Sequence, residues 1–457
     1  MITFSIIQKS QLEGALRLDA EYYQPEYLDI IKEISKFKIG RLKDVLDDIR
    51  YGLYVEPDYQ EEGVNFLRAL NLVDYGIDGE ILKIKGKEIP SKKYLLDEGD
   101  ILIVRSGANT GNVGIIENYL KNFTFGSYTI CLRTTKINPY FLYIFFYSKF
   151  GRSQTLRLQT GMAQPNLNIP NIEEIKIPLN IKKELQEEIE EIVLRAFKIK
   201  ESSKSFYHQA ENSLLEELEL KNFESESSLF SIVNLSDVKK ANRIDAEYFQ
   251  CEHKKIINKM EKYKGGWDYL ENFTEFINNG NQPSYSKDGE IKFFSQKWIK
   301  DKGIDYSFLT DENEPRVLKS FFEDKKNKPY LIRKNDILYY SVGANLGYCH
   351  NYLEDENIAI GSFINLIRAD KNKINPVSLG FVLNSIVGRT QAEMNKSGLA
   401  QPYIYAKNLR KFLIPILPKT TQQKIAGLVQ KSHQARKKAK ELLEEAKQKV
   451  EGMIENA

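Results

Sequence analysis

Several short motifs in this chain resemble parts of catalytic or cofactor sites, but each of them is incomplete. Gly107–Gly114, with the sequence GANTGNVG, is as rich in glycine as a phosphate-binding loop, yet no Lys-Ser/Thr pair and no helical pattern follow it. Ile137-Asn-Pro-Tyr140 lacks the second proline of the amino-methyltransferase motif Asn-Pro-Pro-Tyr, and the chain has no Gly-x-Gly cofactor signature. Pro57-Asp58 matches the start of a metal-dependent nuclease motif, but the acidic-x-Lys element Glu174–Lys176 is too distant to complete it. The glycine-rich segment is therefore expected to be a strand-to-strand loop in which glycine supplies positive φ.

The cysteines and histidines argue against metal and disulfide chemistry. The three cysteines and four histidines are scattered along the chain without C-x-x-C spacing: Cys131, Cys251, Cys349, His208, His253, His350 and His433. Such spacing fits neither a disulfide scaffold nor a His/Cys zinc site, and the chain contains no nucleophile elbow. We therefore expect a non-catalytic protein that uses no metal and no cofactor.

Length and composition indicate a globular protein with more than one domain. The chain has 457 residues, 42% hydrophobic and 28% charged, and this length suggests two to four domains. Lysine and arginine number 66 against 63 acidic residues, a formal charge of +3, so the whole-protein charge does not by itself indicate a nucleic-acid partner. The N-terminal sequence lacks the features of a signal peptide, and no apolar run approaches the roughly 20 residues that cross a bilayer. We expect a soluble, cytoplasmic protein.

The chain contains a tandem duplication. Arg17–Gln24, RLDAEYYQ, returns as Arg243–Gln250, RIDAEYFQ, with six of eight positions identical and an offset of 226 (243 − 17). Asp100-Ile-Leu102 returns as Asp336-Ile-Leu338 at an offset of 236 (336 − 100). The offset grows only through small insertions and the order of the motifs is preserved, so the second half of the chain is a copy of the first.

The first part of each copy, residues 1–180 and 228–417, is predicted to be a mixed α+β domain. It is rich in aromatic and β-branched residues and is interrupted often by glycine, proline and asparagine. Short strands bounded by turns are expected at residues 100–104, 128–133, 336–340 and 363–368, and short helices at 26–35 and 139–148.

A long amphipathic helix is predicted after each domain, over residues 181–220 and 418–457. Apolar or small residues recur at alternating steps of four and three, the heptad pattern of a coiled coil. In the first helix these residues are Leu185, Ile189, Ile192, Ala196, Ile199, Ser203, Phe206 and Ala210. In the second helix they are Ile425, Leu428, Ser432, Ala435, Ala439, Leu442 and Ala446.

The charges of the two helices favour their pairing. Residues 181–220 hold six basic and ten acidic residues, and residues 419–457 hold nine basic and five acidic, giving −4 and +4. We therefore expect two antiparallel helices that form a coiled coil of roughly 57 Å, join the two domains and close the chain into a pseudo-twofold α+β molecule, with residues 221–227 as a linker. The alternative is that each helix packs only on its own domain.

The end of each domain resembles a known family, the specificity subunits of type I restriction-modification enzymes. Gly161-Met-Ala-Gln-Pro165 precedes an Ile-Lys-Ile-Pro strand and the long helix, and Gly398-Leu-Ala-Gln-Pro402 precedes Leu413–Pro418 and a helix that begins with Gln-Gln. These elements are similar to the family's Gly-x-x-Gln, its Ile-Pro-x-Pro strand and its Glu-Gln helix start. Asn180 stands where the second proline usually occurs, and Gln186 comes later than the pattern has it, which leaves the start of the first helix open.

The resemblance covers essentially the whole chain and implies a function. In that family each target recognition domain reads one half of an asymmetric, bipartite DNA site, and the helices set the spacing and dock the modification subunits. Two modification subunits methylate adenine with S-adenosylmethionine, and restriction subunits perform ATP-driven translocation and cleavage. The resemblance therefore implies a subunit that binds double-stranded DNA without cutting or methylating it. Two recognition domains held at a fixed separation can contact two major-groove segments roughly 34 Å apart.

Candidate DNA contacts lie in loops that both copies share, where polar side chains supply phosphate and base contacts. They are Tyr54, Arg68, Asn71, Arg105, Ser106 and Asn109 in the first copy, and Gln282, Ser295, Lys297, Ser341 and Asn345 in the second. Arg68 is equivalent to Ser295 (295 − 68 = 227) and Arg105 to Ser341 (341 − 105 = 236), and different polar residues at equivalent places suit two different half-sites. The alternative for each is an ordinary surface residue.

Other duplicated polar residues are expected to be structural. Gln164 and Gln401 recur with their glycine and proline, which favours a role in the loop over base reading. Asp19-Ala-Glu21 and its copy at Asp245 would repel DNA, so we predict a turn that anchors each domain.

Two other functions remain open from the sequence. One is a structural adaptor whose helices organise partner proteins and whose domains do not read DNA. The other is a stand-alone restriction or modification enzyme, which the incomplete motifs disfavour.

Overall fold

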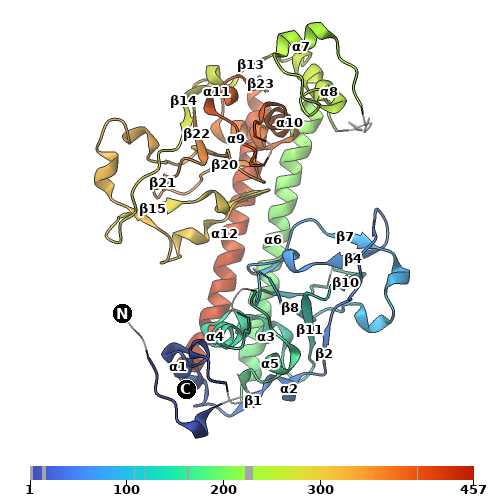
Figure 1. The fold of residues 1–457 in the computed structure, drawn as a ribbon, viewed down its shortest axis with the longest axis vertical. Coiled ribbons are helices and arrows are strands. Elements are labelled where there is room, and N and C mark those ends of the chain that lie inside the picture. Colours follow the sequence, from blue (N-terminus) through green and yellow to red (C-terminus); the bar gives the residue numbers. More distant parts are fainter. Residues whose placement is uncertain are drawn as a thin grey trace. The chain divides into compact units, whose positions relative to one another are not determined.

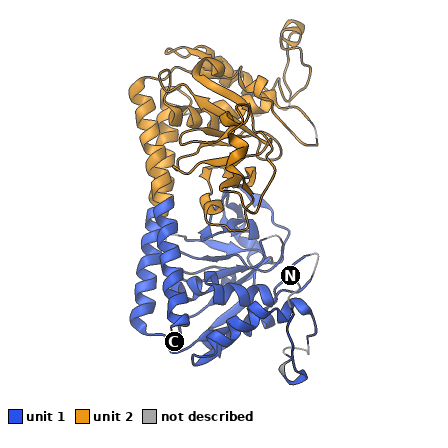
Figure 2. Ribbon diagram, turned by 90° about the vertical axis from the view of Figure 1, so that its left-hand side faces the viewer, with its two compact units in different colours: residues 1–199, 437–457 blue, residues 200–436 orange. Residues whose placement is uncertain are grey.

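The computed structural model describes residues 4–12, 17–107, 109–118, 120–161, 164–221, 230–398 and 400–456. It contains two compact units: unit 1 is residues 1–199 with 437–457, and unit 2 is residues 200–436 (Figure 2). Each unit combines one repeated domain with parts of both long helices. Residues 222–227 of the expected linker lie outside the described residues, and the domain boundaries stay a prediction.

Two small sheets form the β part of unit 1 (Figure 1). The central sheet has the order β2-β11-β8-β9 and is antiparallel; its strands are β2 (Asp48–Tyr51), β11 (Thr129–Arg133), β8 (Ile101–Val104) and β9 (Val113–Ile115). The outer sheet has the order β10-β4-β7-β3, with β10 parallel to β4; its strands are β10 (Phe123–Phe125), β4 (Val64–Leu67), β7 (Leu82–Ile84) and β3 (Tyr59–Gln60). Two antiparallel ribbons pair β1 (Ile39–Arg41) with β12 (Lys176–Pro178) and β5 (Leu72–Val73) with β6 (Gly76–Ile77). The helices are α1 (Pro25–Ile34), α2 (Leu42–Val45), α3 (Pro139–Tyr147), α4 (Lys149–Arg157) and α5 (Ile169–Glu173).

Unit 2 repeats this arrangement. Its central sheet has the order β14-β22-β19-β20, with β14 (Thr274–Asn279), β22 (Ile364–Ala369), β19 (Ile337–Tyr340) and β20 (Cys349–Asn351). The outer sheet is β18-β15-β21, with β18 (Arg316–Val317), β15 (Ile291–Phe294) and β21 (Ile358–Ile360). The ribbons are β13 (Trp267–Tyr269) with β23 (Leu413–Pro415) and β16 (Ile299–Lys300) with β17 (Gly303–Ile304), and the helices are α7 (Leu235–Ala241), α8 (Cys251–Glu261), α9 (Pro376–Asn384), α10 (Ile386–Asn395) and α11 (Ala406–Leu409). The predicted α+β class and all the predicted strands and short helices are confirmed.

Each core is built around a helix that is apolar on every side. α3 begins where Pro139 occupies its first turn and the Asn138 side chain accepts hydrogen bonds from two backbone amides, and residues 140–146 of α3 are all buried. A helix without a polar face must be covered all round. In unit 1 the sheet covers one side, where the Tyr147 hydroxyl donates to the Val113 carbonyl at 2.5 Å, and the long helix covers another, where Phe197 packs against Tyr143. α9 has the same place in unit 2.

The long helices are α6 (Lys183–Glu217) and α12 (Lys419–Glu455), and they pair antiparallel as predicted. In unit 2 the buried hydroxyls of Ser203 and Ser432 bond each other's backbone carbonyls at 2.8 and 2.9 Å, and Thr421 donates to Glu217 at 3.0 Å, so the numbering falls along one helix as it rises along the other. In unit 1 Lys449 of α12 forms an ion pair with Glu188 of α6 at 2.8 Å, a contact between the oppositely charged helices. No helix in the described ranges is both long and apolar enough to span a membrane.

The predicted seam of α6 is buried at half of its positions, is shifted by one residue at two others, and is only partly buried at Leu185 and Ile199. Ile189, Ala196, Ser203 and Ala210 are buried as expected, but Val193 and Tyr207 are buried in place of Ile192 and Phe206. In α12 Ile425, Ser432, Ala439, Leu442 and Ala446 are buried, whereas Leu428 and Ala435 are only partly buried. The physical reason is that each helix faces both its partner helix and a globular domain, so its apolar stripe is wider than a coiled-coil seam and shifts toward the domain.

Equivalent glutamines fix the beginning of each long helix. The Gln186 side chain accepts a hydrogen bond from the Asn138 backbone at 2.9 Å and donates to the Ile181 carbonyl, and Gln422 does the same for Asn375 and Leu417. Each glutamine therefore joins the first turn of a long helix to the start of the apolar helix α3 or α9. α6 and α12 begin at equivalent residues (419 − 183 = 236), which resolves the helix start that the sequence left open.

A second pair of glutamines, buried in the short helices, supports the ribbon that leads into each long helix. Gln154 of α4 donates to the Lys176 carbonyl at 2.9 Å and accepts from the Lys176 amide at 2.8 Å. Gln391 of α10 makes the same two bonds with Leu413, at 3.0 and 2.6 Å. Each glutamine side chain makes the two hydrogen bonds that a neighbouring strand would otherwise make with β12 or β23. The backbone amide and carbonyl of Lys176 and of Leu413 therefore have partners.

An arginine on the central sheet neutralises a buried aspartate in each unit. Arg133 makes two hydrogen bonds to Asp100, at 2.7 and 2.6 Å, and Arg368 makes two to Asp336, at 2.8 and 2.6 Å. The side chains of Asp100 and Asp336 are only 1% and 4% exposed. Each aspartate also accepts a backbone amide three residues earlier, so the pair connects β8 or β19 with the neighbouring strand and the preceding turn.

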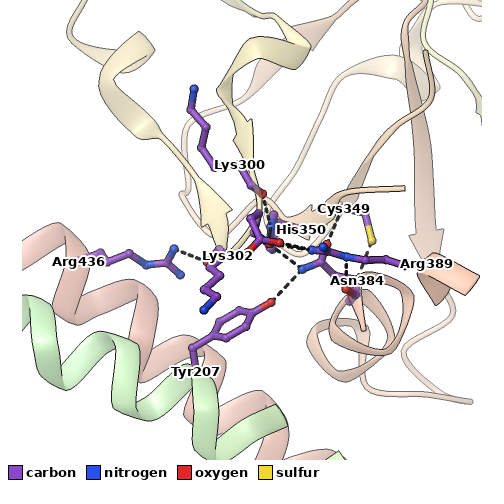
Figure 3. Close-up of polar contacts among 10 residues, drawn as sticks. Tyr207, Lys300, Lys302, Cys349, His350, Asn384, Arg389 and Arg436 are labelled. Atoms are coloured by element: carbon purple, nitrogen blue, oxygen red, sulfur yellow. Dashed lines mark hydrogen bonds and ion pairs between the residues drawn. The ribbon is translucent and has the colours of Figure 1, made fainter. Parts of the chain in front are cut away.

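A polar network in unit 2 connects the turn between β16 and β17 with the long helices (Figure 3). Asn384 donates to the Tyr207 hydroxyl of α6 at 2.9 Å and to the Asp301 carbonyl at 3.0 Å, while Arg436 of α12 donates to the Lys302 carbonyl. The His350 ring lies 2.9 Å from the Lys300 carbonyl, so its Nε2 carries the proton and donates. Burial lowers the pKa of His350 to about 3.

We expect the stability of unit 2 to fall on mild acidification because His350 stays neutral in the folded chain. The unfolded histidine takes up its proton near pH 6.5 and the folded one only near pH 3, so between these values the unfolded state binds more protons and stability decreases as pH falls. The full shift corresponds to about 2 kcal/mol between pH 7 and pH 5; because the residue is only half-buried, we expect about 1 kcal/mol. Urea unfolding of wild type and His350→Gln at both pH values measures this. Equal losses in the two proteins would contradict the prediction, because the glutamine amide can donate but does not titrate.

Removing the arginine of a buried pair is expected to destabilise its unit. Arg368→Met leaves the Asp336 carboxylate buried with only its backbone donor, and an unpaired buried charge costs about 3 kcal/mol or more. The matched control is Lys334→Met, which removes an ion pair between Lys334 and Asp355, whose side chains are 50% and 87% exposed respectively. This substitution should lower the free energy of unfolding by less than about 1 kcal/mol. Chemical denaturation of both variants measures the difference, and similar losses would show that the buried pair contributes nothing special.

Candidate nucleic-acid interface

The ends of several strands of unit 1 meet at one edge of its sheets. β2 and β8 are both antiparallel to β11, so their carboxyl ends lie beside the start of β11. The Arg105 amide donates to the Tyr128 carbonyl at 2.9 Å, the Ser127 amide to the Leu53 carbonyl at 2.9 Å, and the Gly126 amide to the Leu67 carbonyl at 3.0 Å. We call residues 52–54, 68, 105–107, 109–112, 126–128 and 164–167 the loop edge of unit 1.

Unit 2 has an equivalent loop edge, formed by residues 280–285, 295–297, 341–347, 361–363 and 401–405. The Gly280 amide donates to the Ile364 carbonyl at 2.7 Å, the Ser341 amide to the Phe363 carbonyl at 3.2 Å, and the Ile404 amide to the Ser341 carbonyl at 2.9 Å. The counterparts of these bonds in unit 1 run from the Gly52 amide to the Thr129 carbonyl at 3.2 Å, from Arg105 to Tyr128, and from Leu167 to Arg105 at 2.7 Å. The backbone frames of the two edges are therefore alike, although most of their exposed side chains differ.

Paired glycines let the loops approach each other at both edges. A Cβ on Gly52 would lie 2.3 Å from the Gly126 carbonyl oxygen, and one on Gly280 would lie 2.2 Å from that of Gly361. Any side chain there would separate the loop after β2 or β14 from the loop before β11 or β22. Gly107 and Gly111 have φ of +100° and +88°, so the glycine-rich segment is the strand-to-strand loop predicted from sequence.

Three of the predicted residues of unit 1 present side chains at the loop edge. Tyr54 is 94% exposed, and Asn109 is exposed. Arg105 is half-buried; its guanidinium lies 4.7 Å from the centre of the Tyr51 ring and donates to Asn166 at 3.3 Å. A planar guanidinium held in this way has a fixed direction and suits recognition of a phosphate or a guanine edge.

The other three predicted residues of unit 1 shape the loops. Asn71 is fully buried, accepts from the Arg68 amide at 3.0 Å and donates to two backbone carbonyls. Arg68 donates to the Glu80 carbonyl at 3.0 Å. Ser106 is buried and accepts from Gln164 at 3.2 Å, which supports the loop role predicted for that glutamine.

Unit 2 divides in the same way. Gln282 and Asn345 are exposed, and Gln282 donates to the Tyr285 hydroxyl at 3.1 Å. Ser341 is fully buried and donates to the Phe363 carbonyl at 2.7 Å, so it holds the backbone of the edge. Lys297 forms an ion pair with the buried Glu314 at 2.5 Å.

The predicted equivalence of residues 68 and 295 is visible in the local structure. Arg68 precedes the 3₁₀ turn Ala69–Asn71, and Ser295 precedes the 3₁₀ turn Gln296–Trp298, where its hydroxyl accepts from the Lys297 amide. Each residue follows a strand of the outer sheet. The two copies therefore place different side chains at the same point of the frame.

Sequence reasoning missed two exposed aromatic residues at the loop edges. Tyr128 is 62% exposed and Phe363 is 55% exposed, and they occupy equivalent positions immediately before the central strands (363 − 128 = 235). The search for contacts considered polar residues, so it passed over these two. The signal that was available is an aromatic residue two positions after a duplicated glycine, Gly126 or Gly361.

The duplicated acidic turn anchors each domain, as predicted. Arg17 pairs with Asp19 and donates to the Gln159 carbonyl at 3.4 Å, and Arg243 pairs with Asp245 and donates to the Lys396 carbonyl at 3.4 Å. The Arg17 and Arg243 contacts fall at equivalent residues (396 − 159 = 237), so in both copies an arginine paired with an aspartate holds this segment in place.

Other features of the described residues offer no competing site. They contain no cluster of three or more His, Cys, Asp or Glu side chains suited to hold a metal ion. A groove of about 420 Å³ between α1 and α4 is lined by Glu26, Asp29, Glu33 and Lys149, and its acidic lining would repel DNA phosphates.

Comparison with known proteins shows which domain residues 34–205 resemble. Residues 34–205 match the family model of the type I restriction modification DNA specificity domain, and comparison with curated proteins finds no match. Among solved structures the chain is similar to the S subunit of a type I restriction-modification system from M. genitalium, at 14% identity and a TM-score of 0.45, over 92% of this chain and 95% of that one. It is also similar to the HsdS subunit from Thermoanaerobacter tengcongensis, at 16% identity and a TM-score of 0.30, over 92% of this chain and 96% of that one. Residues 34–205 are therefore similar to the type I restriction-modification DNA specificity domain, the family that the sequence motifs resemble.

Proposed function

We propose that this chain is the DNA-reading subunit of a type I restriction-modification complex and that each unit reads one half of a bipartite site. The observation that carries the proposal is the duplicated loop edge: one backbone frame occurs twice, with different side chains at most of the equivalent places that were compared. Tyr54 of unit 1 corresponds to Gln282 of unit 2 (282 − 54 = 228), and the Arg105 position is taken by a buried serine. A protein that bound the same ligand twice would keep the same side chains at both edges.

The exposed groups have the chemistry of DNA recognition. Arg105 supplies a fixed guanidinium, Asn109, Asn345 and Gln282 supply amides, and Tyr54 supplies a hydroxyl on an aromatic ring. Arginine pairs with guanine and amides pair with adenine in the major groove, and all of these groups can also donate to phosphates. The match of residues 34–205 to a DNA specificity domain supports this assignment.

The chain acts through partners in this proposal. Modification subunits, two per chain, transfer the methyl group, and restriction subunits translocate and cleave the DNA. The chain itself performs neither reaction and needs no cofactor, because its catalytic motifs are incomplete. We place it in the cytoplasm as part of the proposal, because its ligand is cellular double-stranded DNA.

Methylome sequencing tests the proposal directly. Cells that express the chain with its modification subunit should show methylation at one asymmetric sequence made of two half-sites, and the map gives both half-sites and their spacing. Methylation without any sequence preference would refute DNA reading and leave the structural adaptor. Activity of the purified chain alone with magnesium or S-adenosylmethionine would instead show a stand-alone enzyme.

Arg105→Ala should weaken binding to the methylated sequence about 10-fold, because one good base or phosphate contact contributes about 1–3 kcal/mol. A gel shift with the modification subunit present measures the affinity for that sequence. The matched control is Arg41→Ala, an exposed arginine of β1 that pairs with Asp44 and Glu174. Equal affinities of the two variants, with an unchanged methylation map, would exclude Arg105 from the interface.

A further inference from the structure

The two loop edges differ in most exposed side chains but share an exposed asparagine, Asn109 and Asn345, and an exposed aromatic residue, Tyr128 and Phe363. Tyr128 and Phe363 are the residues directly before β11 and β22, and each exposes more than half of its aromatic surface. Exposing a large aromatic side chain loses the free energy that its burial would give. Two such residues at equivalent points of two largely different edges therefore indicate a contact that both edges need.

The backbone that carries each ring is fixed. The Tyr128 carbonyl accepts the Arg105 amide at 2.9 Å, and the Phe363 carbonyl accepts both the amide and the hydroxyl of Ser341, at 3.2 and 2.7 Å. Gly126 and Gly361, two residues earlier, are in close contact with the opposite loop. An aromatic side chain on such a backbone has only two rotatable bonds to order, so little entropy is lost when it binds a ligand.

The side chains decide which part of DNA fits them. Phe363 has no polar atom and cannot bond a phosphate; the Tyr128 hydroxyl could donate to one, but the group that both edges share is the aromatic ring, which does not suit a phosphate. An aromatic ring instead makes apolar contact with the thymine methyl group, which distinguishes thymine from the other bases. The Arg105 amide donates to the Tyr128 carbonyl, so in unit 1 the residue that carries the ring lies directly beside a candidate polar contact.

We propose that Tyr128 and Phe363 each make an apolar contact with a base, one in each half-site. The inference rests on the proposed function and extends it: polar residues that differ between the edges select different bases, while an aromatic residue common to both supplies an uncharged contact. This contact depends on base identity and contributes nothing to the salt dependence of binding.

The test uses the full chain with its modification subunit and a DNA duplex carrying the sequence that wild type selects from a random library. Tyr128→Ala and Phe363→Ala should each bind that duplex about 10-fold more weakly, while their affinity for a scrambled duplex stays unchanged. The slope of log Kd against log salt concentration should equal the wild-type slope. Tyr128→Phe and Phe363→Tyr should keep wild-type affinity. Repeating the selection should show that Tyr128→Ala relaxes only one half-site and Phe363→Ala only the other.

The control is Tyr269→Ala, which removes a 42% exposed aromatic residue of β13 outside the loop edge and should bind both duplexes like wild type. Unchanged affinity of the two test variants would overturn the inference. An equal loss on selected and scrambled DNA, or a smaller salt slope, would also overturn it, because it would show a backbone contact. If wild type itself selects no sequence, the proposed function fails and the inference fails with it; if wild type selects and the variants do so equally well, only the inference fails.

Discussion

The enclosure of an apolar helix governs the structure of each unit. α3 buries seven consecutive residues and α9 buries eight, so neither helix has a side that can face water. A sheet covers only one side of such a helix, and segments of the long helices must cover the rest. The hydrophobic cluster of unit 1 accordingly includes Val193 from α6 and Leu443 from α12, which are 250 residues apart in sequence (443 − 193). The long helices are therefore part of the folded core as well as connectors between domains.

Because the core of each unit encloses α3 or α9, the residues that fix its backbone are different from the residues that its loop edge exposes. The interactions of the frame are the same in both units: a glutamine at the start of the long helix, a buried glutamine beside the ribbon, and an aspartate paired with an arginine on the central sheet. The loop edges rest on this frame, and their own backbone contacts also recur. Most of the exposed side chains at the edges differ, so under the proposed function a change of recognised bases would require no change in the packing of the core.

The sequence predicted those features that depend on local pattern. Strands, short helices, the two long helices and their antiparallel pairing follow from residue periodicity, charge and the internal repeat. Val193 and Tyr207 are buried one residue after the predicted seam positions. The heptad pattern describes packing against the partner helix only, whereas α6 also packs against the adjacent domain. The loop residues were the least predictable. Asn71 and Tyr54 are both polar loop residues, yet one is fully buried and the other is 94% exposed, because burial depends on which loops meet in the folded unit.

The near-neutral charge of the chain now has a structural interpretation. The long helices carry −4 and +4, so the net +3 lies on the remaining parts, and two predicted cations there are already engaged, Lys297 with Glu314 and Arg68 with the Glu80 carbonyl. DNA-binding proteins with strongly cationic faces gain much affinity from the release of counterions, and this affinity does not depend on sequence. A chain with few free cations at its loop edges gains little from that source. Under the proposed function, sequence discrimination then comes from short-range contacts, and the proposed partner subunits supply the remaining affinity.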